Sequence, residues 1–209
     1  MKILELAPSP SARRVGIFLA ELGIEVPREQ LNLRDGDNLT PEFKRKSVNG
    51  RIPVLELDDG THICESVAIC RYFDALHPRD SSLFGNSPLE QAQVEMWNRV
   101  LELNGLMVAF QAFRNLTGFF KDRERFVEAW GAESRERIIE FLPTLEARLE
   151  GRDFVAIERF TIADITGFVL IGFLPRLEIE LTDAMPNIRR WHAAIAARPA
   201  VATLLASQQ

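Results

Sequence analysis

The sequence is poor in the residue types that build disulfide frameworks and metal sites. Its 209 residues include two cysteines, three histidines and one tyrosine. Cys64 and Cys70 form neither a CxxC motif nor a metal-ligand spacing, which favours a reducing compartment and argues against a disulfide framework. His62, His77 and His192 are scattered along the chain and suggest neither a ligand set nor a catalytic triad. No metal is therefore expected.

The sequence also has few long hydrophobic runs. The longest, residues 168–174, is too short to cross a bilayer. The N-terminal apolar segment contains Glu5, which predicts no signal peptide. A net charge of −5 gives no reason to expect nucleic acid or an anionic membrane as a partner. A composition of 46% hydrophobic and 26% charged residues is ordinary for a folded protein with a core. We expect a soluble, cytoplasmic protein with no nucleic-acid or membrane partner.

Residues 1–78 alternate between predicted strands and helices. The apolar pattern predicts strands over residues 2–6, 26–33, 53–57 and 61–63, and helices over 11–22, 41–46 and 66–76. Gly23 suits the end of the first helix, and Thr40-Pro41 suits the start of the second. The resulting order, βαβαββα, predicts an α/β domain in which helices pack on a mixed sheet.

A segment rich in Pro, Ser, Asp and Gly, residues 79–87, is the best domain boundary in the chain. Beyond it, residues 88–209 are predicted to form an all-α domain. Its expected helices cover residues 89–116 with a bend near Gly105, 122–149 with an interruption at Pro143, 161–175, 187–197 and 199–205.

The stretch from Arg51 to Ser66 is predicted to form a binding site. It is interpreted as a strand entered through Pro53, a tight turn at Asp59-Gly60, a second strand, and a helix that begins at Glu65-Ser66. The backbone of Ile52 beside the proline is expected to face outward, where it can pair with an extended peptide. The N–H groups at the start of the helix favour a carboxylate. Together these features suit a small acidic peptide.

The sequence contains four motifs whose residues and order along the chain resemble those of the cytosolic glutathione transferase superfamily, and the resemblance covers the whole chain. They are Arg51-Ile52-Pro53-Val54-Leu55, Glu65-Ser66-Val67-Ala68-Ile69, Phe160-Thr161-Ile162-Ala163-Asp164-Ile165, and the closing run 186–201. The resemblance implies a thioredoxin-like N-terminal domain, a helical C-terminal domain and a homodimer. It is closest to the serine-type (theta-, nu- or phi-like) classes.

The resemblance also implies a set of glutathione-binding residues. Ile52, next to Pro53, would pair with the glutathione backbone, and Glu65 would bind the γ-glutamyl ammonium. Ser66 would bind the γ-glutamyl carboxylate, while Arg51 could reach either the glycyl carboxylate or the γ-glutamyl end. One departure is the dipeptide at 47–48, which is Ser-Val here where the family usually has Asn-Pro.

The resemblance further implies a hydroxyl or thiol just after the first strand that stabilises the glutathione thiolate, the reactive form of the thiol. The only tyrosine, Tyr72, lies in the third predicted helix, and both cysteines are far from the first turn. That leaves serine, and when Arg13 and Val15 are matched to the Arg-x-Val of the serine-type classes, the resemblance implies that Ser9 is the catalytic hydroxyl. Ser11 is the alternative contact to the thiol, is included among the glutathione-binding residues, and is the expected N-cap of the first helix.

Phe110, Phe113 and Arg114 are candidates for the pocket of the electrophilic substrate, although aromatic residues at helical spacing are more often part of a core. Three functions remain open. The first is a transferase that conjugates glutathione to a small, apolar electrophile. The second is a glutathione-dependent disulfide or peroxide reductase, and the third is a non-catalytic glutathione-binding scaffold. Outside the site, Thr161 and Asp164 are expected to form a structural capping box.

Overall fold

The computed structural model describes residues 1–207, which divide into two compact units. The first unit contains Met1–Asp80 and the segment from Arg198 onward, and the second contains Ser81–Ala197. Each unit is described separately below.

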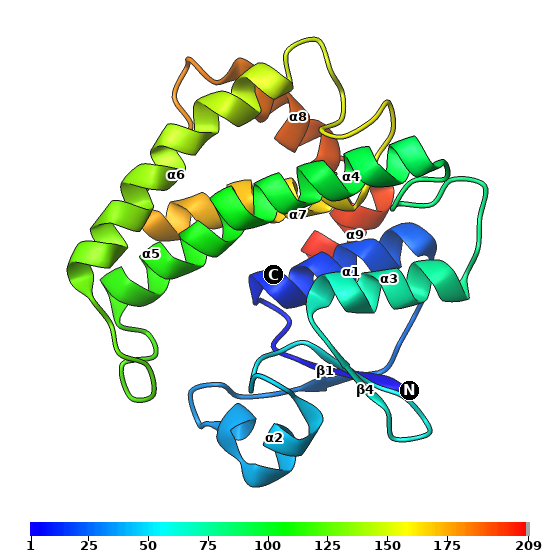
Figure 1. The fold of residues 1–209 in the computed structure, drawn as a ribbon, viewed down its shortest axis with the longest axis vertical. Helices are drawn as coiled ribbons and strands as arrows, with labels where there is room; N and C mark the ends of the chain where they lie inside the picture. Colours follow the sequence, from blue (N-terminus) through cyan, green and yellow to red (C-terminus); the bar gives the residue numbers. More distant parts are fainter. Residues whose placement is uncertain (208–209) are drawn as a thin grey trace. The chain divides into compact units, whose positions relative to one another are not determined.

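The first unit is an α/β domain with the predicted element order (Figure 1). Its elements are β1 (Lys2–Glu5), α1 (Pro10–Leu22), β2 (Arg28–Gln30), a 3₁₀ turn (Asp37–Leu39), α2 (Pro41–Lys46), β3 (Val54–Glu56), β4 (His62–Cys64), α3 (Ser66–Leu76) and α9 (Pro199–Ala206). Several ends follow from local chemistry. Gly23 ends α1 in the left-handed conformation, and Thr40 caps α2 by accepting a 3.1 Å hydrogen bond from the Phe43 N–H.

The four strands form one mixed sheet in the order β2-β1-β3-β4. β1 runs parallel to β2 and antiparallel to β3, and β3 runs antiparallel to β4. The sheet and its helices confirm the expected thioredoxin-like fold class.

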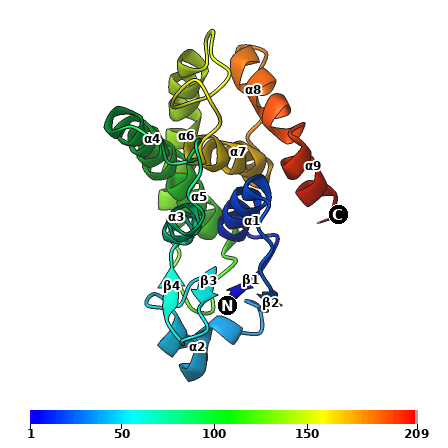
Figure 2. The same cartoon turned by 90° about the vertical axis from the view of Figure 1, so that its right-hand side faces the viewer.

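The two faces of the sheet are covered by different helices. Leu4 and Val54 point to one face, where they form a buried cluster with Phe43 of α2. Ile3 and Leu55 alternate with them and are also fully buried. Figure 2 shows α1 and α3 side by side on one face of the sheet and α2 on the other. Both faces are therefore buried, which rigidifies the strand ends that carry the candidate site.

The last helix, α9, packs against α1. Leu204 approaches Gly16, where an added Cβ would lie 3.2 Å from a leucine methyl. Arg198 also forms two hydrogen bonds to the Glu21 carboxylate, of 2.8 and 2.6 Å. The sequence-based boundaries (1–78, 79–87 and 88–209) placed this helix in the second domain, whereas its contacts group it with the first unit.

The second unit is entirely helical over the residues described. It contains α4 (Pro88–Leu101), a π-helical turn (Glu102–Leu106), α5 (Met107–Thr117), α6 (Glu128–Arg148), α7 (Ile162–Phe173), a 3₁₀ turn (Leu174–Leu177) and α8 (Pro186–Ala196). The predicted bend near Gly105 is the π turn between α4 and α5. The predicted interruption at Pro143 is wrong, because α6 continues through it.

Helix α7 forms the centre of this unit, and its residues 162–171 are all buried. At its start, Asp164 Oδ2 accepts a 2.9 Å hydrogen bond from the Thr161 N–H, and Oδ1 accepts bonds from the Val155 N–H (2.8 Å) and the Trp191 indole N–H (3.1 Å). This carboxylate therefore joins the loop before α7 to both α7 and α8.

No helix within residues 1–207 is long and apolar enough to cross a membrane.

Candidate functional site

The strand register brings the predicted binding residues to one end of the sheet. Val54 pairs with Leu4 of β1 on one side and with Cys64 of β4 on the other. Pro53 lies just before β3 and Glu65 just after β4, each one residue beyond this pairing, and β1 ends at Glu5 on the same side. Segments about 50 residues apart in the sequence therefore meet where β1 leads into α1 and β4 leads into α3.

Ile52 precedes Pro53 through a cis peptide bond at this end of the sheet. The Ile52 side chain is half-buried and packs against the cluster of Leu4, Phe43 and Val54. Within residues 1–207, neither the N–H nor the C=O of Ile52 is engaged in a hydrogen bond. Both groups can therefore pair with an extended peptide, as β-strand addition requires.

Ser9 is half-buried and is the N-cap of α1. Its Oγ accepts a 3.3 Å hydrogen bond from the Ala12 N–H, and Pro10 occupies the first helical position. The expectation that Ser11 caps this helix is therefore wrong: with Ser9 as the cap and proline at N1, the helix starts two residues earlier, and Ser11 lies in its first turn. Since the Ser9 hydroxyl acts as an acceptor in the cap, its proton is available to a ligand.

The turn before Ser9 is fixed by side chains of the sheet. The Ala7 N–H donates a 2.9 Å hydrogen bond to Gln30 Oε1, and Gln30 Nε2 donates to the buried Glu5 carboxylate at 3.4 Å. Glu5 also accepts a 2.7 Å hydrogen bond from Arg28. Both partners come from β2, so the edge strand holds the β1–α1 turn in place.

Ser66 begins α3 and is buried, and its hydroxyl accepts a 3.1 Å hydrogen bond from Arg14 Nη1. Arg14 lies on α1 and is only 3% exposed. A guanidinium can only donate, so the Ser66 proton can point to another acceptor. The free N–H groups of α3 and the nearby positive charge both favour an anion at this helix end.

Glu65 precedes α3 with a positive φ of 69°. This is unusual for a residue with a side chain, and such strain is concentrated at functional sites. The exposed Glu65 carboxylate accepts a 2.7 Å hydrogen bond from Asn49 Nδ2. Asn49 is a residue that the sequence reasoning missed, because its partner is 16 residues away and no motif marks it.

Arg51 is exposed, and its backbone is held by the loop that precedes it. The buried Ser47 hydroxyl donates to the Arg51 C=O (2.8 Å) and accepts from the Arg51 N–H (3.0 Å), and Asn49 Oδ1 accepts from the same N–H (3.0 Å). Ser47 thus provides the local anchoring where the family pattern usually has Asn-Pro.

Other candidate nucleophiles lie away from this end of the sheet. Tyr72 is in the body of α3, with its ring edge against Phe73. Cys70 is fully buried, and burial raises the pKa of its thiol far above the usual range, so it stays protonated. Within residues 1–207, no group of three or more His, Cys, Asp or Glu side chains is placed to hold a metal ion.

The candidate electrophile residues lie on α5 in the second unit. Phe110 and Phe113 are half-buried, and each lies 5.5 Å, between ring centroids, from Phe173. Phe113 also lies 5.6 Å from Phe119, which is 39% exposed. Arg114 is paired with Glu124 and stacks 4.8 Å over the Phe120 ring, so its charge is already compensated.

Comparison with protein families gives two matches. Residues 8–76 match the glutathione S-transferase N-terminal domain, and residues 120–199 match the glutathione S-transferase C-terminal domain.

Individual relatives agree. Glutathione S-transferase 2 of Saccharomyces cerevisiae is 33% identical over 98% of this chain and 89% of its own. Among solved structures, a class Gtt2 glutathione S-transferase of Vibrio parahaemolyticus has a TM-score of 0.86 and 52% identity, covering 98% of this chain and 96% of that one. Gtt2 from Saccharomyces cerevisiae has a TM-score of 0.90 and 31% identity, covering 98% and 100%.

Proposed function

The chain belongs to the glutathione S-transferase family, and on this premise we propose that it binds glutathione at the end of its sheet and transfers the thiolate to a small, apolar electrophile. The observation that carries the proposal is the meeting of three elements at one sheet end. These are the Ser9 turn, the Ile52-Pro53 backbone and the Glu65-Ser66 helix start.

In the proposed complex the glutathione backbone pairs with Ile52. The Glu65 carboxylate, oriented by Asn49, binds the γ-glutamyl ammonium. The Ser66 hydroxyl and the α3 N–H groups bind the γ-glutamyl carboxylate, with Arg14 behind them. Arg51 directly precedes Ile52 and would meet a glutathione carboxylate. Ser11 lies two residues after Ser9, the proposed thiol contact, in the first turn of α1.

Ser9 activates the thiol in this proposal. A free thiol has a pKa of about 8.5, so only a few per cent of it is thiolate at neutral pH. A hydrogen bond from the Ser9 hydroxyl to sulfur, aided by the N-terminus of α1, favours the anion. The thiolate then attacks the electrophilic carbon and forms a C–S bond, and the leaving group departs with its electron pair.

The partly exposed ring cluster of Phe110, Phe113 and Phe119 supports an apolar electrophile. The exposed side chains of Leu89, Met96 and Leu103 support a homodimer. They are 68%, 52% and 58% exposed, and their seven-residue spacing aligns them along one side of α4 and the π turn.

The decisive experiment measures glutathione binding by calorimetry together with turnover of an aryl halide and of a small disulfide. We expect saturable binding and aryl-halide turnover. Disulfide turnover alone would favour the reductase alternative, and binding without either turnover would favour a non-catalytic scaffold. Absence of binding at millimolar glutathione, with no rise in melting temperature, would refute the proposal.

A further inference from the structure

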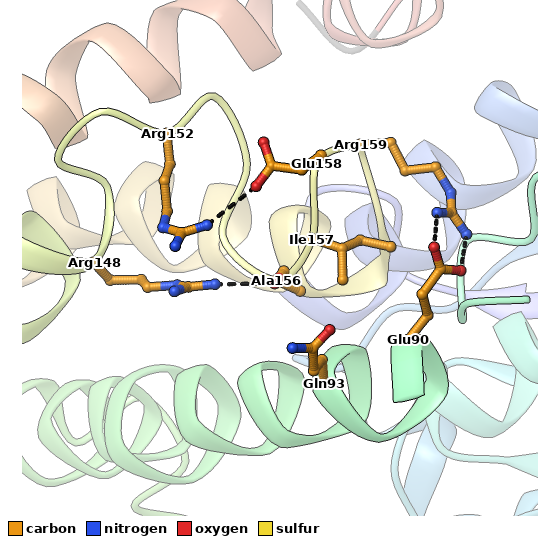
Figure 3. A pocket seen from close by; sticks show the side chains of 8 residues that line it. All are labelled: Glu90, Gln93, Arg148, Arg152, Ala156, Ile157, Glu158 and Arg159. Carbon is orange, nitrogen blue, oxygen red and sulfur yellow. Dashed lines mark hydrogen bonds and ion pairs between the residues drawn. The ribbon is translucent and has the colours of Figure 1, made fainter. Parts of the chain in front are cut away.

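A cavity of about 400 Å³ lies within the second unit, between α4 and the loop that follows α6. Figure 3 shows Gln93 entering it from α4, Arg148 from the end of α6, and Arg152 and Glu158 from the loop. The volume falls within the range of about 300–1,000 Å³ that is typical of small-molecule sites. All of its lining residues belong to the second unit, whereas every residue of the proposed glutathione site belongs to the first.

One end of the cavity is lined by Arg159 and Glu90, which pair with each other. Arg159 binds both oxygens of Glu90, at 2.7 and 2.8 Å, and also donates to Asn86 at 2.7 Å. The Arg159 guanidinium lowers the pKa of Glu90 to about 2, so the pair stays ionised at neutral pH. Because the charges of Arg159 and Glu90 neutralise each other, this pair is not expected to bind a charged ligand.

Arg148 is rigidly held but has no acidic partner. Its guanidinium donates to the backbone oxygens of Val155 (2.7 Å) and Ala156 (2.9 Å) and stacks 4.7 Å over the Trp97 ring. It forms no salt bridge within residues 1–207. Burial and, after it, the charge of Arg152 lower the pKa of Arg148, while the Glu158 carboxylate opposes them. Because two of its five N–H groups are used, others remain for an anion.

The neighbouring Arg152 has only a weak partner. It pairs with Glu158 at 3.2 Å, and the Glu158 side chain is 89% exposed. Such an exposed pair contributes little net stability, so another carboxylate can replace Glu158 at little cost. The Gln93 amide lines the same cavity, makes no hydrogen bond within residues 1–207, and can both donate and accept. Two guanidinium groups and an amide therefore line one cavity, together with the exposed Glu158 carboxylate that pairs with Arg152.

We propose that this cavity is a second ligand site, distinct from the glutathione site, that binds a small organic acid through its carboxylate. The carboxylate would pair with Arg148 and displace Glu158 from Arg152, since planar guanidinium groups match carboxylates in a bidentate geometry. Gln93 would bind the polar remainder of the ligand. This inference goes beyond the proposed transferase function and does not depend on it.

The test uses the full chain and succinate as the probe. Calorimetry should give saturable binding with a Kd of about 1 mM or tighter, and the NMR signal of the Trp97 indole N–H should shift. The uncharged analogue succinamide should not bind. Arg148→Lys should weaken succinate binding about tenfold, since lysine keeps the charge but loses the fork geometry. Gln93→Leu should weaken it several-fold and, because it breaks no hydrogen bond within residues 1–207, should leave the melting temperature unchanged.

Two matched controls make the result decisive. Arg137→Gln, on the same helix but stacked over Trp130, should leave succinate binding unchanged. Ser66→Ala should also leave it unchanged, because Ser66 belongs to the first unit. The proposal is overturned if succinate does not saturate, if Arg137→Gln weakens binding as much as Arg148→Lys, or if Ser66→Ala abolishes it. The last result would place succinate in the glutathione site.

Discussion

The buried guanidinium of Arg14 donates a 3.1 Å hydrogen bond to the hydroxyl of Ser66, which joins α1 to the first residue of α3. Because the Ser66 hydroxyl accepts from Arg14, its own proton can be donated to a ligand bound at the N-terminus of α3. It also places a positive charge behind the position proposed for the γ-glutamyl carboxylate.

Arg14→Met should therefore raise the glutathione Kd by about tenfold, because hydrogen bonds to charged groups contribute about 1.5–3 kcal/mol. Calorimetry measures the Kd, and Arg71→Met, an exposed arginine on α3, is the matched control. If Arg14→Met lowers the melting temperature but leaves the Kd unchanged, Arg14 has only a structural role.

Ser9→Ala should lower kcat/KM for an aryl halide by at least tenfold and raise the pKa of bound glutathione, as read from thiolate absorbance against pH. It also removes an N-cap, which should cost about 1 kcal/mol of stability. Ser9→Thr keeps both the cap and the hydroxyl, so it should recover most of the activity and stability. Ser11→Ala should change the rate little. Equal thiol pKa values in wild type and Ser9→Ala would contradict the catalytic role of Ser9.

Local signals in the sequence were sufficient for most of the architecture. Thr40-Pro41 correctly marked the start of α2, and the alternation of strands and helices predicted the mixed sheet. The contacts that shape the site were not predictable in the same way. Arg14 and Ser66 are 52 residues apart, and Asn49 and Glu65 are 16 apart, so these pairs exist only once the sheet register has formed. Ser9 as the cap was missed although Pro10 at N1 pointed to it.

Asn49→Leu tests the positioning of Glu65. Losing the 2.7 Å hydrogen bond should leave the exposed Glu65 carboxylate free to rotate, which should raise KM for glutathione several-fold with little change in kcat. Steady-state kinetics with varied glutathione measures both constants. Asn104→Leu, an exposed asparagine in the second unit, is the control. A fall in kcat with constant KM would show that Asn49 acts on the reaction and not on binding.

Met96→Glu tests the proposed dimer. A carboxylate at the centre of the apolar row formed with Leu89 and Leu103 would have to be desolvated in an interface, so the variant should be monomeric. Light scattering coupled to size-exclusion chromatography gives the mass. Gln91→Glu adds the same charge to an exposed position on another side of α4 and should remain a dimer. A wild-type mass of one chain would refute the dimer itself.

Asp164→Asn should lower the free energy of unfolding by about 3 kcal/mol, since an amide cannot accept hydrogen bonds with both of its terminal atoms and would leave buried N–H donors unpaired. Urea denaturation measures the loss.

The pH dependence of the stability difference between wild type and Asp164→Asn follows from the pKa of Asp164, which burial raises to about 6.

An unfolded aspartate has a pKa of about 3.9, so between the two values the folded chain binds more protons than the unfolded chain. Wild type should therefore gain stability over Asp164→Asn as the pH falls from 7 to 5, by about 1 kcal/mol. The Thr161 hydroxyl, 3.1 Å from Oδ2, can accept the added proton. If the difference between the two proteins instead stays constant from pH 7 to 5 and shrinks only at lower pH, the four donors around Asp164 outweigh burial and hold its pKa below the unfolded value.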